Sequence, residues 1–253
     1  MPSQLSQQNE RRHDVVIIGG GSAGYAAART ARDAGADVAI VDQGPLGGLC
    51  ILRGCMPTKT ILRSAEIMAL MKRAGEFGLT PVSARADLSA IVDRKNRLVQ
   101  EFADYRIAAL RDPRFTLYES RAEFISPHEI RAGALHIRAT AFVIATGSRP
   151  AEVAIPGLEQ AGYLTSDEML DVRQAPSSLL VLGGGLVAVE FAQFFSRIGT
   201  KVIMVQRGAT LLSDMDSDVG QALASAFQDE GIEVITGVSF EQVTSSPTGK
   251  TVQ

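Results

Sequence analysis

Two stretches of the chain share one pattern of apolar and polar positions. Residues 13–44 and 177–208 each begin with an apolar run, pass through three glycines into an amphipathic segment, and end in a second apolar run. Equivalent glycines, Gly19 with Gly183 and Gly35 with Gly199, are the same 164 residues apart. Continuous Val, Ile and Leu runs are typical of buried parallel strands, and the amphipathic segment between them is typical of a crossover helix. The pattern therefore predicts two strand–helix–strand units of one kind.

The segment between these units predicts two helices and a small β-rich piece. Residues 57–76 and 87–111 favour helices, and short β-rich runs follow over 115–147, with a hairpin at the glycine of IRAGALHI. We therefore predict an α/β protein with two Rossmann-like dinucleotide-binding domains, each three layers around a parallel sheet, and a small antiparallel β piece in the first. The expected divisions are a disordered tail over 1–12, a first domain over 13–150, and a partial second domain over 151–253 in a chain that we expect to continue.

Composition narrows the classes of function. With 253 residues, 45% of them hydrophobic and 21% charged, the chain can bury two cores and is neither disordered nor fibrous. A net charge of −3 provides no basic footprint for nucleic acid. The polar N-terminus lacks a signal-peptide pattern, and glycines and charges interrupt the longest apolar runs, so no membrane segment is expected. Two cysteines are too few for a secreted disulfide scaffold, which favours the cytoplasm.

The first glycine-rich turn has the spacing of a dinucleotide site. Gly19, Gly21 and Gly24 follow an apolar run and open the amphipathic segment. Glycine is needed there to turn sharply, to let a diphosphate approach the backbone, and to pack helix on strand. Free N–H groups at the helix start then bind the diphosphate, and Asp42, at the end of the next strand, can accept a hydrogen bond from a ribose hydroxyl. The alternative is a glycine-rich turn with no ligand.

The second turn is a variant of the first. Gly183 and Gly185 are retained, and Ala188 replaces the third glycine. The following strand ends at Gln206 and Arg207 rather than at an acid. Loss of a carboxylate together with gain of a cation favours a 2′-phosphate, and hence NADPH over NADH. The alternative is that Arg207 is an ordinary surface charge.

The two cysteines lie in one stretch, GGLCILRGCMPTK, over residues 47–59. Cys50 and Cys55 follow a Gly-Gly turn at the predicted start of a helix, where the helix dipole favours a thiolate. Because a regular helix would not bring positions five apart together, a disulfide between them would lie in a distorted first turn and would be labile. The alternative is a pair of buried thiols with a structural role. No other residues have the spacing of a metal site, and we expect none.

The positions of two charged residues, Glu190 and Lys59, suggest that they pair with each other. Glu190 lies in the otherwise apolar LVAVEFAQFF, where a buried carboxylate would need a partner. Lys59, one helical turn after Cys55, is a plausible partner for it. The alternative for each is an exposed surface charge.

These motifs together resemble the flavoprotein disulfide reductases of the glutathione reductase, dihydrolipoamide dehydrogenase and mercuric reductase group. GGLCILRGCMPTK is similar to that family's redox-active sequence, ATGSRP (145–150) to its second flavin-binding turn, and GGGLVAVEFA (183–192) to its nicotinamide-binding turn. The resemblance implies FAD in the first domain, NADPH or NADH in the second, and a homodimer. It implies an enzyme that passes electrons from NAD(P)H through FAD to a Cys50–Cys55 disulfide, and on to a disulfide, a lipoyl group or Hg(II).

The resemblance also assigns roles to residues. It makes Cys55 the thiolate against the flavin, Cys50 the thiol that meets substrate, and Lys59 a residue at the flavin edge, paired with Glu190. The expected catalytic residues are therefore Cys50, Cys55, Lys59 and Glu190. The expected cofactor-binding residues are Gly19, Gly21, Ser22, Ala23, Gly24, Asp42, Gln43, Gly48, Leu49, Cys50, Gly54, Cys55, Lys59, Ala122, Ala145, Thr146, Gly147, Ser148, Gly183, Gly185, Leu186, Val187, Glu190, Gln206 and Arg207.

Some positions depart from the family, and other functions stay open. Leu186 stands where some members have a tyrosine gate, and His13, His128 and His136 match no catalytic position. The family's His-Glu acid–base pair would lie beyond Gln253. The main alternative function is a flavin- and nucleotide-binding redox sensor with little turnover. A metal-binding protein using the two thiols is a third, although it leaves both glycine-rich turns unexplained.

Overall fold

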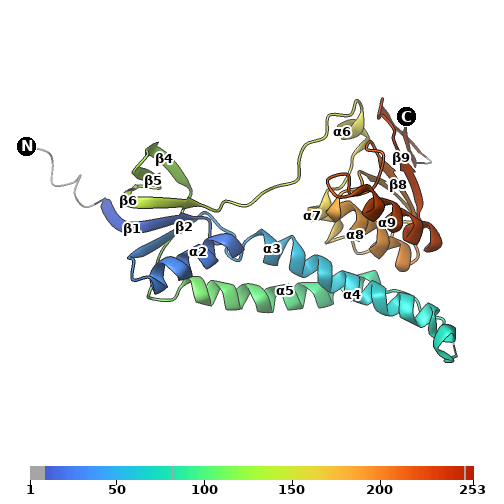
Figure 1. Cartoon of the computed structure of the whole chain (residues 1–253), viewed down its shortest axis with the longest axis horizontal. Coiled ribbons are helices and arrows are strands. Elements are labelled where there is room, and N and C mark those ends of the chain that lie inside the picture. The colour runs from blue at the N-terminus through green and yellow to red at the C-terminus, as the bar shows by residue number, and fades with distance from the viewer. Residues whose placement is uncertain (1–8, 81, 248) are drawn as a thin grey trace, which may run out of the picture. The chain divides into compact units, whose positions relative to one another are not determined.

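The fold comes from a computed structural model, which describes residues 9–80, 82–247 and 249–253. The chain divides into two compact units, which are treated separately below (Figure 1). Unit 1 consists of Met1–Met56 and Arg97–Arg149, and unit 2 of Pro57–Asn96 and Pro150–Gln253. None of the helices within the described ranges has the length and hydropathy needed to cross a membrane.

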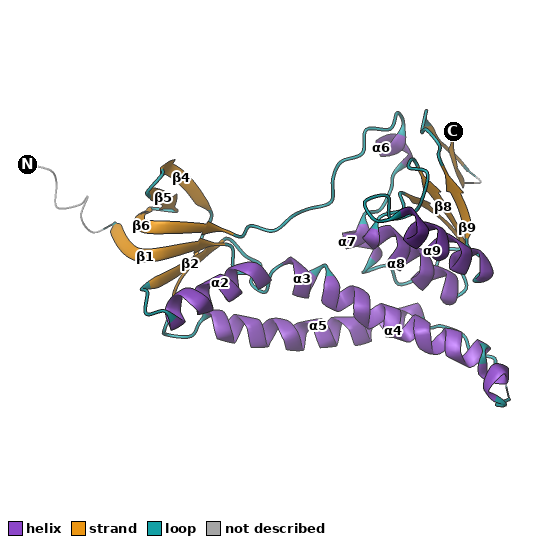
Figure 2. Ribbon diagram, viewed as in Figure 1, coloured by secondary structure: helices purple, strands orange, loops and turns teal. Residues whose placement is uncertain are grey.

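Unit 1 is built on a six-stranded sheet (Figure 2). Its elements are β1 (Glu10–Ile18), α2 (Ser22–Asp33), β2 (Val38–Asp42), α3 (Leu49–Leu52), β3 (Thr116–Glu119), β4 (Ala122–Ser126), β5 (Glu129–Ala132) and β6 (Leu135–Ile144). The strand order is β3-β2-β1-β6-β5-β4, parallel from β3 to β6 and antiparallel from β6 to β4. The expected crossover helix is α2, and the expected hairpin turns at Gly133, where φ is 62°. These observations confirm the predicted parallel sheet with its small antiparallel piece.

The first strand begins earlier than the sequence suggested. Residues 1–8 of the expected tail lie outside the described residues, but Glu10–Arg12 belong to β1 and pair with His136–Arg138 of β6. The expected boundary at residue 12 is therefore wrong for these three residues. Their side chains are exposed and charged, so no apolar pattern marks them, whereas pairing with a neighbouring strand needs only the backbone.

Unit 2 contains the second strand–helix–strand motif. Its elements are β7 (Ser178–Leu182), α8 (Leu186–Arg197), β8 (Lys201–Gln206), α9 (Ser217–Asp229) and β9 (Glu233–Thr236), with short α6 (Leu158–Ala161) and α7 (Ser166–Met169), and a two-stranded sheet of β10 (Val243–Ser246) and β11 (Gly249–Val252). β7, β8 and β9 are parallel and adjacent in that order. Phe194 and Phe195 of α8 are fully buried in the core. The predicted second Rossmann-like unit is confirmed.

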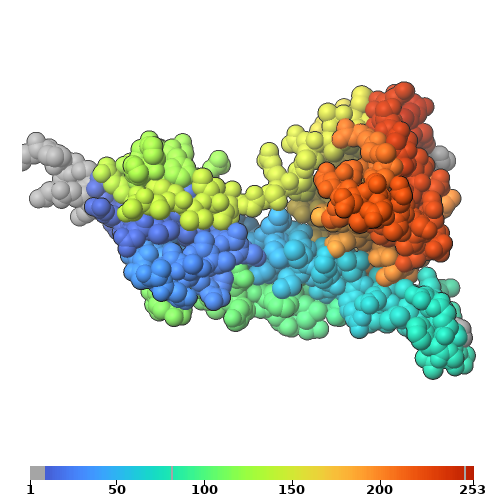
Figure 3. All heavy atoms as spheres, viewed as in Figure 1, coloured from blue at the N-terminus to red at the C-terminus, as the bar shows by residue number. Residues whose placement is uncertain are grey.

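The two predicted central helices are present. They are α4 (Cys55–Lys72), which is followed by the 3₁₀ turn η1 (Ala74–Phe77), and α5 (Leu88–Leu110). The sequence placed both within a first domain over 13–150, but the structure groups residues 57–96 with unit 2. The cause is packing: Ile61 and Val92 belong to the same buried core as Phe194. The end of α4 with η1 is drawn in cyan to green in Figure 3. Leu70 and Phe77 within it are exposed.

Candidate functional site

The first glycine-rich turn is tightly constrained by its neighbours. Gly19 has φ of 102°, and a Cβ there would lie 2.3 Å from the carbonyl oxygen of Ala145. A Cβ on Gly24 would lie 1.8 Å from the carbonyl oxygen of Gly19. α2 starts at Ser22 with Gly21 as its N-cap, has no side-chain cap, and has no acid in its first turn. The helix start is therefore electropositive, which suits a bound diphosphate.

Asp42 is anchored at the end of β2 by the same turn. Its Oδ2 accepts a hydrogen bond from the Gly20 N–H at 2.5 Å, and its Oδ1 accepts one from the Gly44 N–H at 2.7 Å. The carboxylate therefore lies beside the glycine-rich turn, as the sequence predicted, and Gln43 next to it is exposed. Sequence reasoning missed the role of Gly20. The signal was available, because both turns have a glycine at this middle position, Gly20 in the first and Gly184 in the second.

The cysteine stretch lies directly against the first glycine-rich turn. Gly48 has φ of 79°, and a Cβ there would lie 2.4 Å from the Cα of Gly21. Glycine is needed at position 48 for this approach of backbone to backbone, whereas a Cβ on Gly21 would make an ordinary contact of 3.6 Å with the Cα of Gly48. Leu49 then begins α3, so Cys50 lies one residue into a short helix. The redox candidates are thereby attached to the predicted diphosphate site within one unit.

The predicted distortion between the cysteines is a break between two helices. α3 ends at Leu52, and α4 begins at Cys55, with Arg53 and Gly54 between them. The structure holds both cysteines as thiols, with Cys50 partly buried and Cys55 exposed. The disulfide between them stays a prediction.

The segment predicted to form a second flavin-binding turn also meets the first turn. Ala145 follows β6, its N–H donates to the carbonyl of Ile18 at 2.8 Å, and its carbonyl abuts Gly19. Thr146, Gly147 and Ser148 continue from it and are exposed, which leaves their backbone accessible beside the turn. Ala122 differs from these residues, because it packs against the apolar core of the sheet at the start of β4.

The turn in unit 2 repeats the geometry of the first. The Gly183 N–H donates to the carbonyl of Val205 at 2.8 Å, just as the Gly19 N–H donates to that of Val41 at 2.8 Å. The Gly184 N–H donates to Gln206 Oε1 at 3.1 Å, which is the counterpart of Gly20 with Asp42. Gln206 therefore accepts the same hydrogen bond as Asp42 does in the first turn, but it carries no negative charge.

Open space lies beside Gly183 and Gly185 of this second turn. A Cβ on Gly183 or Gly185 would meet no atom of the described residues within 4 Å, and α8 begins at Leu186 without a side-chain cap. Leu186 and Val187 are exposed in its first turn, and Arg207 is exposed after β8. The space beside this turn fits a dinucleotide phosphate, with the apolar side chains of Leu186 and Val187 at its edge.

Lys59 and Glu190 form the ion pair that the sequence predicted. Lys59 Nζ, on α4, donates to Glu190 Oε1, on α8, and both residues belong to unit 2. The expected burial of Glu190 is wrong, because its side chain remains 32% exposed and that of Lys59 60%. The two chain segments lie 131 residues apart, so the pair depends on tertiary packing. The roles of these residues at a flavin stay predictions.

A family model and curated proteins match the sequence of this chain. The family model for pyridine nucleotide-disulphide oxidoreductases matches residues 13–253. The chain is 35% identical to the mercuric reductase of Staphylococcus aureus over 91% of the chain and 42% of that protein. It is 33% identical to the dihydrolipoyl dehydrogenase of Acholeplasma laidlawii over 92% of the chain and 71% of that protein.

A solved structure shows the same fold. The HOCl-induced flavoprotein disulfide reductase RclA from Escherichia coli matches with a TM-score of 0.80 and 30% identity, over 95% of the chain and 52% of that protein. The chain therefore spans about half of RclA, and less than half of the mercuric reductase. Since the family model covers nearly the whole chain and the fold agrees, the chain belongs to the pyridine nucleotide-disulphide oxidoreductase family.

Proposed function

We propose that the protein is a flavin-dependent oxidoreductase that passes electrons from NAD(P)H to a redox-active pair, Cys50 and Cys55. FAD would be bound by unit 1 and the pyridine nucleotide by unit 2. The observation that supports this most is the close approach of Gly48 to Gly21, which attaches the cysteine stretch to a glycine-rich turn of the dinucleotide-binding kind. Membership of the family supports the same reaction class.

Different residues of the chain would bind the cofactor, carry the electrons and stabilise charge. Bound FAD would supply the two-electron chemistry that links a nicotinamide to a dithiol. The backbone N–H groups at the start of α2 would bind the diphosphate, and Asp42 would accept a hydrogen bond from the ribose. Oxidation of the two thiols would form one S–S bond and release two electrons and two protons. Lys59, which Glu190 holds in place, would provide positive charge for the reduced state.

The substrate of this proposal is a small thiol-reactive species. A dithiol can reduce a disulfide or a lipoyl group by exchange, and it can bind Hg(II) through both sulfurs. Relatives that are named for mercury and for dihydrolipoyl substrates both resemble this chain. A homodimer and a cytoplasmic location, where thiols are kept reduced, belong to the same proposal.

A thiol count tests the proposal. In protein loaded with FAD and oxidised, neither cysteine is expected to react with a maleimide. Anaerobic NADPH is then expected to expose two thiols per chain, counted by mass spectrometry, because the disulfide receives the electrons. The proposal is contradicted if the protein takes up no flavin, or if the number of reactive thiols is the same with and without NADPH. A change in thiol count without turnover of any small disulfide, lipoamide or Hg(II) would favour the redox sensor instead.

We also propose that NADPH is preferred to NADH. Gln206 keeps the acceptor for Gly184 without a negative charge, and exposed Arg207 follows it. Arg207→Glu is expected to raise the KM for NADPH about tenfold or more, since a charge-assisted contact is lost, while the KM for NADH changes little. Lys201→Glu, an exposed charge reversal at the start of the same strand, is the control. Equal changes for both nucleotides would remove the basis for the preference.

A further inference from the structure

Arginine side chains of unit 1 lie over one pair of aromatic rings. The rings of Tyr25, on α2, and Phe115, just before β3, meet edge to face with their centroids 6.4 Å apart. The guanidinium of Arg106, on α5, lies 4.5 Å from the centre of the Tyr25 ring, and that of Arg32 lies 5.0 Å from the centre of Phe115. Arg114 belongs to the turn between α5 and β3. The cluster therefore combines segments that are far apart in the sequence.

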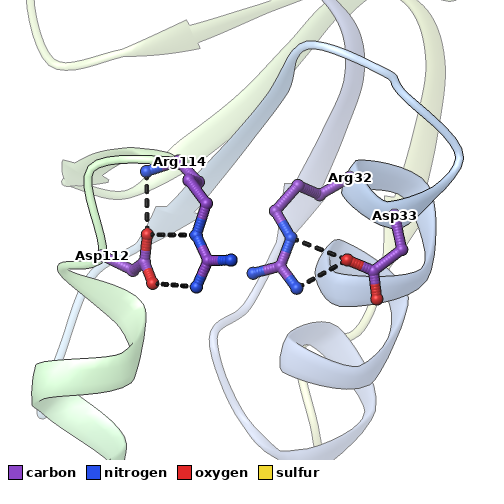
Figure 4. A network of polar contacts seen from close by, with 4 residues as sticks. All are labelled: Arg32, Asp33, Asp112 and Arg114. Carbon is purple, nitrogen blue, oxygen red and sulfur yellow. Dashed lines mark hydrogen bonds and ion pairs between the residues drawn. The ribbon is translucent and has the colours of Figure 1, made fainter.

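Two of these guanidinium groups point toward each other (Figure 4). Asp33 accepts hydrogen bonds from Arg32 Nε and Nη2 at 2.9 and 2.6 Å. Asp112 accepts them from Arg114 Nε and Nη2, also at 2.9 and 2.6 Å. Each carboxylate thus lies on the outer side and occupies the same edge of its arginine. The Nη1 atoms of Arg32 and Arg114 face the space between the two arginines.

The third arginine, Arg106, has donors that no described residue satisfies. Nε and Nη1 of Arg106 are buried, and neither has a hydrogen-bond partner among the residues that the structure describes. An aromatic face attracts the cation but accepts no strong hydrogen bond. Arg29 adds further positive charge, because its guanidinium lies 5.9 Å from the centre of the Tyr25 ring. Four arginines therefore lie at or beside the two aromatic rings, in a chain whose net charge is −3.

Local electrostatics keep Asp112 ionised. Hydrogen bonds from the side chain and backbone of Arg114, and the nearby charge of Arg32, hold the pKa of Asp112 well below its ordinary value. The two carboxylates can neutralise only part of the positive charge of four arginines. The C-terminus of α2 favours a cation such as Arg32, but that does not explain why the guanidinium of Arg114 turns toward it.

We propose that Arg32 and Arg114 together bind an oxyanion group, a phosphate or a carboxylate, between their Nη1 atoms. The guanidinium group binds both kinds of oxyanion through directional, charge-assisted hydrogen bonds. A bound anion would relieve the repulsion between the two facing cations, and Arg106 would add to its attraction. Arg32 lies about 15 Å along α2 from the helix start, so this site is separate from the diphosphate turn. Its ligand would be a small anionic molecule other than the diphosphate.

An NMR titration tests the site. The arginine Nε–H signals of ¹⁵N-labelled protein are followed while sodium phosphate is added, with sodium chloride at matched ionic strength as the reference. The signals of Arg32 and Arg114 are expected to shift in a saturable way with phosphate alone. A parallel titration with sodium succinate identifies the preferred group, since tighter binding of phosphate or of succinate assigns a phosphate or a carboxylate ligand.

Two variants make the test specific. Arg114→Gln is expected to weaken binding about tenfold, the effect of losing one charge-assisted contact. Arg111→Gln is the matched control, because Arg111 is similarly exposed, 58% against 64%, and forms its own ion pair with Glu119. It is expected to change the affinity less than about twofold. Shifts that chloride reproduces, or equal losses in the two variants, would overturn the proposal.

Discussion

Replacing either Cys50 or Cys55 with serine is expected to stop electron transfer to disulfide substrates and to leave flavin reduction by NADPH intact. A hydroxyl cannot form or exchange a disulfide, so the rate with a small aromatic disulfide should fall about a thousandfold or more. Bleaching of the flavin absorbance by NADPH under anaerobic conditions should stay within about twofold, because that step needs neither sulfur. Stopped-flow absorbance measures both rates in one sample.

The two serine variants also separate the roles of the cysteines. The family resemblance assigns the contact with substrate to Cys50, yet within unit 1 Cys55 is the more exposed thiol. If the assignment is right, Cys55→Ser traps a stable mixed disulfide through Cys50, and Cys50→Ser traps much less; mass spectrometry of the adduct decides. Met56→Leu, adjacent to Cys55 on α4, is the control for local packing. Turnover that survived in either serine variant would make the cysteine pair structural.

Gly24→Ala is expected to lower the free energy of unfolding by about 3 kcal/mol and to abolish FAD binding. The added Cβ would lie 1.8 Å from the Gly19 carbonyl oxygen and 3.2 Å from Ile17 Cγ2. Gly19 cannot easily move away, because its N–H is bonded to Val41 and its Cα abuts Ala145. Urea unfolding followed by circular dichroism measures the stability, and flavin fluorescence measures binding.

The second unit offers a matched control for this substitution. Ala188 occupies the position equivalent to Gly24, so the chain itself tolerates a Cβ there. Ala188→Gly is expected to cost about 1 kcal/mol or less, the usual difference between glycine and alanine in a helix. If Gly24→Ala proved as mild as Ala188→Gly, the close approach of helix to turn in unit 1 would not be needed for stability.

The strand–helix–strand units could be predicted because their patterns are local and repeated. The apolar runs, the glycines and the amphipathic segments lie within about thirty residues of one another, and their spacing alone defines the element types. The hairpin at Gly133 and the helices α4 and α5 were predictable on the same grounds. The start of β1 was not, because Glu10–Arg12 pair through their backbone without an apolar signal.

The sequence by itself determined which chemistry the chain offers: two glycine-rich turns, one cysteine pair, and an acid or its amide counterpart at each strand end. These depend on residue types at short spacing. Only the tertiary structure decided which of them meet. The contact of Gly48 with Gly21, the pairing of Lys59 with Glu190, the grouping of residues 57–96 with unit 2, and the facing of Arg32 and Arg114 each join distant segments. The physical reason is that apolar side chains are interchangeable in a sequence pattern, whereas burial selects one set of neighbours for them by close packing.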